Sequence, residues 1–172
     1  LDYEYSPSGE LDYAGITFSY PEELVTGATL IANGPYHVWK NRMKGTTFGV
    51  FNKKYNNTIT GESWDYPEFK GYYSNFYGVQ IRTKELPITI FSATDDLFLH
   101  LLTPGTAKYS TRSTGVRGEV NPPFPDGNIS FLHGISPIGT KFTRADAEGP
   151  QSQKNKYNGE SLKGTLYFRI GE

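Results

Sequence analysis

The chain has 172 residues, no cysteine, and 17 basic against 18 acidic residues, which gives a formal net charge of -1. A disulfide framework and a thiolate metal site are excluded, and one domain held by packing and hydrogen bonds is the default at this length. Nucleic acid is not expected as a partner, because phosphate binding needs a basic face. No apolar run approaches the roughly 18 residues of a membrane-spanning helix, so no membrane partner is expected either.

Aromatic residues make up 15% of the chain, with 13 tyrosines and 11 phenylalanines beside 19 glycines and 11 prolines. Rings and β-branched residues interrupted by turn residues favour strands and loops. No window shows a sustained helical period, so the sequence predicts an all-β domain in which two sheets pack together. In chain order, the predicted strands are Leu1–Tyr5, Gly15–Tyr20, Ala28–Ala32, Thr46–Phe51, Asn75–Thr83, Ile88–Ser92, Leu97–Leu102, Asn128–His133 and Gly164–Ile170.

Alternation supports several of these strands. Val79, Ile81 and Thr83 share one face of their strand, while the residues between them share the other, as expected for a half-buried strand. The nearly continuous apolar run 97–102 fits a strand covered on both sides, with a short buried helix as the alternative. The stretch 151–156 is predicted to be a polar surface loop.

Two long connections stand out, since loops of more than about 12 residues are usually functional or disordered. We interpret 61–74, which is rich in aromatic residues, as functional and 104–125 as mobile. Sugars have an apolar C–H face and a rim of hydroxyls, and are held by aromatic platforms flanked by polar groups. The alternative is that these rings fill the core. The carbohydrate-binding candidates near this loop are Trp64, Tyr66, Glu68, Tyr72, Tyr73 and Asn75.

No catalytic constellation is recognisable. Glycoside hydrolysis normally needs two facing carboxylates, and the acids of the aromatic loop, Glu62, Asp65 and Glu68, sit in no catalytic frame. The pair Asp95 and Asp96 is typical of a turn. The three histidines are too far apart for a local metal motif, and neither a serine nucleophile elbow nor a phosphate-binding glycine loop is present. We therefore expect no catalytic residue, metal or cofactor in this chain.

The segment 33–42 reads Asn-Gly-Pro-Tyr-His-Val-Trp-Lys-Asn-Arg. It resembles the GPxExYxDR segment in the C-terminal domain of the large β-galactosidases of glycoside hydrolase family 2. Gly34, Pro35 and Arg42 match that pattern, while its Glu, Tyr and Asp are replaced by His37, Trp39 and Asn41. Weaker similarity extends over nearly the whole chain, which resembles the later part of the family domain.

The resemblance implies an antiparallel supersandwich of the galactose mutarotase type, and a non-catalytic accessory domain, since the family's catalytic glutamates lie in a separate barrel. The expected partners are the catalytic and sandwich domains of a parent β-galactosidase-like hydrolase and, weakly, carbohydrate. We expect the chain, which opens on Leu1 without signal-peptide features, to belong to a longer periplasmic or secreted protein. The alternatives are an autonomous carbohydrate-binding module, and a small hydrolase using Glu62 or Glu68 with Asp65.

The matched motif has a structural interpretation of its own. Gly34 would accept a positive φ in a tight turn, and Pro35 fixes its own φ. Arg42 could bind backbone carbonyls or a carboxylate with its planar fork and so tie the turn to neighbouring strands. The alternative is direct sugar contact by Trp39 or Asn41.

Overall fold

The computed structural model describes residues 1–55, 71–102, 123–140 and 143–171. Within these ranges the chain is all-β, with antiparallel strands, three short 3-10 turns and no α-helix, so no described helix is long and apolar enough to cross a membrane. The predicted all-β class with antiparallel sheets is confirmed. The strands are β1 Asp2–Tyr5, β2 Ser8–Leu11, β3 Ala14–Phe18, β4 Val25–Gly34, β5 Thr47–Lys54, β6 Gly78–Thr83, β7 Ile88–Ser92, β8 Phe98–Leu101, β9 Ile129–Gly134, β10 Asn155–Asn158 and β11 Leu162–Ile170, and the turns are η1 Glu22–Leu24, η4 Ala145–Ala147 and η5 Pro150–Ser152.

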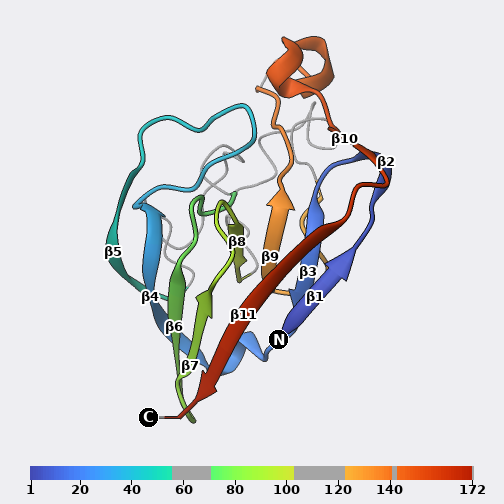
Figure 1. Cartoon of the computed structure of the whole chain (residues 1–172). Helices are drawn as coiled ribbons and strands as arrows, with labels where there is room; N and C mark the ends of the chain where they lie inside the picture. The colour runs from blue at the N-terminus through green and yellow to red at the C-terminus, as the bar shows by residue number, and fades with distance from the viewer. Residues whose placement is uncertain (56–70, 103–122, 141–142, 172) are drawn as a thin grey trace.

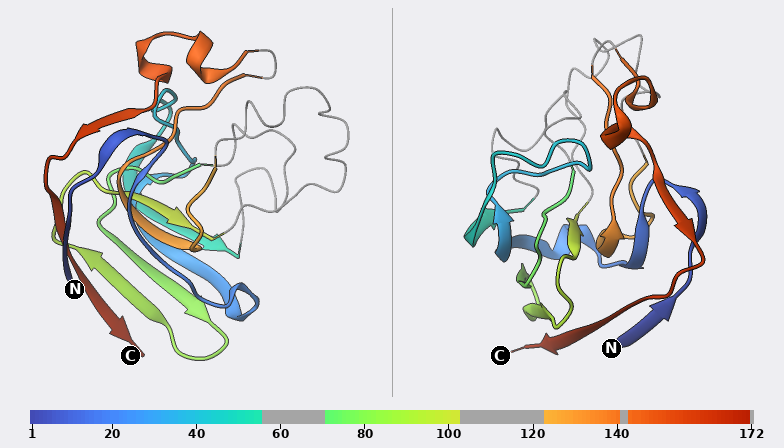
Figure 2. Two further views of the ribbon diagram at one scale, coloured as in Figure 1. Left: turned by 90° about the vertical axis from the view of Figure 1, so that its right-hand side faces the viewer. Right: turned by 45° about the horizontal axis from the view of Figure 1, so that its top comes forward.

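The strands form two main layers. A six-stranded sheet has the order β1-β11-β7-β6-β4-β5, and a three-stranded sheet has the order β3-β9-β8. The larger sheet forms the front layer in Figure 1, and the right-hand view of Figure 2 shows it curving around the smaller one. A third, two-stranded sheet pairs β10 with β2 beside these layers.

All nine predicted strands occur, and the run 97–102 contains a strand, β8, and not a helix. Two further strands, β2 and β10, were not predicted. Both are short and polar, and β10 begins inside the predicted loop 151–156. Their extended conformation follows from pairing with each other, from Asn155 opposite Leu11 to Asn158 opposite Ser8.

The first core cluster lies between the two main sheets. Leu30, Val79 and Ile90 form a continuous row across β4, β6 and β7, and they belong to the same cluster as Leu99 and Phe131 of the smaller sheet. All five side chains are buried. Burying one such side chain contributes about 1.5–3 kcal/mol, so this row supplies much of the hydrophobic stabilisation.

A second core cluster covers the other face of the three-stranded sheet. Along β9, Phe131 belongs to the first cluster and its neighbour Leu132 to the second, together with Trp39, Tyr72 and Ile138. Both faces of β9 are therefore covered, although Ser130 and His133 interrupt its apolar residues.

Gly15 shows how closely the smaller sheet is packed. A methyl group at Gly15 would overlap the Phe131 carbonyl oxygen and the backbone of Leu132 on the neighbouring strand. We expect Gly15→Ala to lower the free energy of unfolding by about 1–3 kcal/mol, because backbone atoms must move to admit it. Gly149→Ala is the control, since nothing lies within 4 Å of the added atom there. Urea denaturation of both variants measures the difference, and equal midpoints would contradict the packing described here.

Candidate functional site

Only part of the aromatic loop belongs to the described residues. Trp64, Tyr66 and Glu68 fall outside the described residues, as do their neighbours from 61 to 70 and residues 104–122 of the second long connection. The interpretations of these segments as functional and mobile therefore stay predictions.

Three of the predicted sugar-binding rings are core residues. Trp39, Tyr72 and Tyr73 are all buried. Backbone hydrogen bonds between Val38 and Tyr72, and between Tyr73 and Leu99, draw both tyrosines inward. The Trp39 and Tyr72 rings meet edge to face with centroids 5.5 Å apart. The expected exposed platform does not include these three rings, and the alternative of core filling holds for them.

Gly34 and Pro35 of the turn motif shape the backbone at the end of β4. Gly34 ends β4 without a positive φ, contrary to expectation, and precedes a cis peptide bond to Pro35. A methyl group there would lie 2.7 Å from Cδ2 of Phe51, so the glycine makes room for that ring. Asn75 has a φ of 51°, which asparagine tolerates better than most residues, and its amide lies 3.5 Å from Oδ1 of Asn33.

Asn41 joins two distant segments. Its Nδ2 donates to the Ile138 carbonyl and to Ser152 Oγ, both at 2.8 Å, and its Oδ1 accepts from the Ile138 amide at 3.0 Å. Arg42 makes longer contacts, 3.5 Å to the Gly139 carbonyl and 3.9 Å to the Glu148 carboxylate. Asn41 and Arg42 therefore tie the motif to residues 138–152, whereas Arg42 was expected to tie it to the strands beside the turn. The contact with such a strand is made at Pro35, whose carbonyl accepts from Lys53 Nζ of β5 at 2.7 Å.

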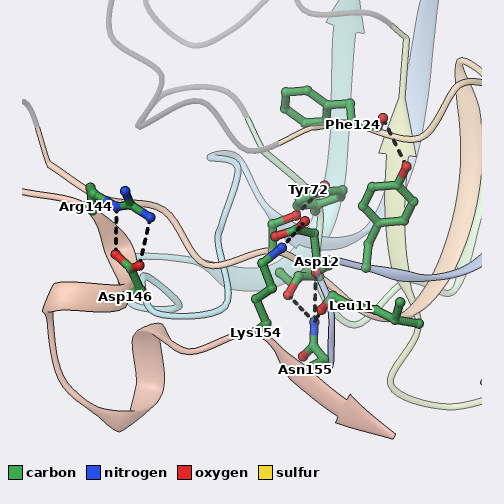
Figure 3. Close-up of polar contacts among 11 residues, drawn as sticks. Leu11, Asp12, Tyr72, Phe124, Arg144, Asp146, Lys154 and Asn155 are labelled. Atoms are coloured by element: carbon green, nitrogen blue, oxygen red, sulfur yellow. Dashed lines mark hydrogen bonds and ion pairs between the residues drawn. The ribbon is translucent and has the colours of Figure 1, made fainter. Parts of the chain in front are cut away.

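Further contacts fasten the same region to the N-terminal part of the chain. As Figure 3 shows, Asn155 Nδ2 donates to the carbonyls of Leu11 and Asp12, at 3.3 and 2.8 Å, and Lys154 pairs with the Asp12 carboxylate at 2.9 Å. Asn155 also donates to the Ile135 carbonyl at 3.0 Å. These polar groups bind one another, so we do not place a ligand site among them.

The contacts of Asn41 and Arg42 predict unequal stabilities for their alanine variants. Asn41→Ala leaves backbone groups of Ile138 without partners and should cost about 1–3 kcal/mol. Arg42→Ala should cost less than about 1 kcal/mol, because its side chain is 38% exposed and its contacts are long. Chemical denaturation provides the measurement, with Asn158→Ala on β10 as an exposed control. A larger loss in Arg42→Ala than in Asn41→Ala would overturn this order.

The outer face of the six-stranded sheet carries an exposed apolar row. Strand register aligns Val50, Ile31, Gly78, Phe91 and Tyr167 across β5, β4, β6, β7 and β11. Val50 is 68% exposed, Phe91 48% and Tyr167 62%. The Phe91 ring lies over Gly78, where a methyl group would be 2.7 Å from Cδ1, so the backbone holds the ring in place. Phe48 and Tyr77, with ring centroids 5.3 Å apart, are also exposed.

A polar row runs beside this apolar row on the same face. It consists of Asn52, Thr29, Gln80, Thr89 and Arg169, aligned across the same five strands. Next to it is a shallow depression of about 560 Å³. Its lining is formed by Thr26, Gln80, Arg82, Thr83, Pro87, Thr89, Arg169 and Gly171. Sequence alternation predicted the outward side of β6, but only the register brings these residues together.

The described residues offer little for acid–base chemistry. No Asp or Glu among them is buried, as a general acid with a raised pKa usually is. The described residues also contain no group of three or more His, Asp or Glu side chains that could hold a metal ion. On the outer sheet face, exposed rings lie beside hydroxyl, amide and guanidinium groups.

His100 is a buried imidazole in the second core region. Its ring stacks on Phe124 at 4.9 Å, and neither of its nitrogens has a hydrogen-bond partner in the described structure. Burial lowers the pKa of His100 from 6.5 to about 4, although the Glu22 carboxylate and the Gly127 backbone act in the opposite direction. The side chain is therefore neutral at physiological pH.

Because the pKa of His100 is lowered by burial, we expect the folded protein to lose stability in acid. The unfolded chain takes up this proton near pH 6.5 and the folded chain only near pH 4, so the free energy of unfolding falls as the pH is lowered between these values. The shift corresponds to roughly 3 kcal/mol when complete. In His100→Phe this component should vanish, which denaturation at a series of pH values measures against the parent. Parallel pH profiles for the two proteins would rule it out.

Comparison with known proteins identifies no relative. A scan against protein-family models, a search of curated proteins and a search of solved structures each found no match. The functional interpretation therefore depends on the residues described above.

Proposed function

We propose that this chain is a non-catalytic accessory domain of a large β-galactosidase-like glycoside hydrolase, of the mutarotase-like supersandwich type, and that it binds carbohydrate through the outer face of its six-stranded sheet. The observation that carries the proposal is the apolar row lying directly beside the polar row on that face. The resemblance of segment 33–42 to the family motif supports the choice of parent.

The two rows suit the two kinds of surface on a sugar. The two rows are two residues apart along each strand, which is about 6–7 Å. A sugar ring stacked on Phe91 or Tyr167 would therefore have its hydroxyls within reach of Gln80 and Thr89. Aromatic residues with a few placed polar groups are the usual composition of such sites. An autonomous carbohydrate-binding module would use the same face.

A neighbouring domain could also cover an exposed apolar row. Aromatic and arginine side chains are common in protein interfaces as well. The row beside the rings, however, consists mainly of hydroxyl and amide groups, which suit a ligand rich in hydroxyls. The mixture of rings, hydroxyls, amides and guanidinium groups therefore favours a sugar ligand.

The proposal predicts weak binding that depends on two rings. Stacking with a few solvent-competed hydrogen bonds should give millimolar affinity, about -4 kcal/mol. Titration of the chain with oligosaccharides, followed by amide shifts in NMR spectra, should move residues of the two rows. Phe91→Ala and Tyr167→Ala should each weaken binding severalfold, whereas Tyr36→Ala, which removes an exposed ring outside the rows, should not.

The titration also tests the placement of the site. Shifts confined to other surfaces, or no shifts with about 20 mM of any oligosaccharide, would refute a sugar-binding role for this face. In that case the apolar row is better explained as a contact with another domain of the parent.

A further inference from the structure

We propose that the depression beside the polar row is a carboxylate subsite, so that the preferred ligand is an acidic saccharide containing uronate residues. This inference rests on the proposed function. Arg82 and Arg169 both line the depression, and its lining contains no Asp or Glu. The local charge is positive in a chain whose formal net charge is -1.

Arg82 is fixed in place by neutral groups. Its Nη1 donates to Thr29 Oγ1 at 2.7 Å, and its Nη2 donates to Asn52 Oδ1 at 2.7 Å and to the Lys53 carbonyl at 2.8 Å. None of these acceptors carries a negative charge, so the guanidinium remains a net cation. Nε has no partner among the described residues.

A glycine makes this arrangement of Arg82 possible. Gly27 pairs with Arg82 across β4 and β6, and a methyl group at Gly27 would lie 2.5 Å from Nη2. Without a side chain there, the guanidinium can cross β4 and reach Asn52 and Lys53 on β5. The Arg82 guanidinium is therefore held in one position by its hydrogen bonds to β4 and β5.

Arg169 supplies the second charge. It lies opposite Thr89 at the end of the polar row. Its side chain is exposed and has no ion-pair or hydrogen-bond partner within the described ranges. A guanidinium fork matches the geometry of a carboxylate, and also that of phosphate or sulfate. The aromatic rings in the adjacent row favour an anion carried on a sugar ring over a free inorganic anion.

The test compares ligands that differ only in charge. Trigalacturonate should bind the full chain at least tenfold more tightly than the neutral trisaccharide of the same linkage, as followed by amide shifts at low ionic strength. The preference should shrink in about 0.5 M salt, which screens charges at exposed sites. Arg169→Gln should reduce it to about twofold or less, because the glutamine amide can still form hydrogen bonds to hydroxyl groups but carries no charge. Lys163→Gln, an exposed charge change elsewhere on β11, should keep the full preference.

Each other outcome has its own meaning. Equal affinity for both trisaccharides, or a preference that survives Arg169→Gln, overturns the carboxylate subsite while binding at the two rows leaves the proposed function intact. If neither trisaccharide shifts the two rows, the proposed function fails as well. If inorganic phosphate binds as tightly as trigalacturonate, the site is a general anion site and the saccharide assignment is wrong.

Discussion

Burial of both faces of the three-stranded sheet is the constraint on which the rest of the structure depends. Along β9, alternate side chains enter two different cores, Phe131 toward the six-stranded sheet and Leu132 toward the cluster around Trp39 and Tyr72. A strand with two buried faces needs a cover on each side. The six-stranded sheet supplies one cover, and the segments around Val38, Tyr72 and Ile138 supply the other.

The same constraint accounts for the position of the candidate site. The inner face of the six-stranded sheet is used for the first core, which leaves its outer face to solvent across five strands. Register then decides the chemistry of that face, because it aligns one apolar row directly beside one polar row. Two glycines shape this surface. Because they lack side chains, the Phe91 ring can pack on Gly78 and the Arg82 guanidinium can lie over Gly27.

The sequence was sufficient to predict nine of the eleven described strands, but not the surface that they form. Alternation at Val79 and Ile81 and the apolar run 97–102 mark real strands, because burial on one or both faces leaves a pattern within a single segment. The polar strands β2 and β10 leave no such pattern, since they pair with each other and have no alternating buried face. In a chain this rich in aromatic residues, composition alone could not separate the buried Tyr72 and Tyr73 from the exposed Phe91 and Tyr167. The outer rows combine residues from five strands, so no single segment shows them.

The placement of β11 has a consequence for synthesis on the ribosome. This strand, residues 162–170, lies between β1 and β7, and the backbone nitrogen of Leu1 donates to the Leu166 carbonyl at 2.8 Å. Until β11 has been made, β1 lacks the strand beside it in the sheet and β7 has an open edge facing solvent. Such edges pair readily with other chains. A nascent chain therefore depends on β11 to complete this sheet, and truncation within β11 should leave the edge of β7 open to pairing with other chains as well as remove stabilising contacts.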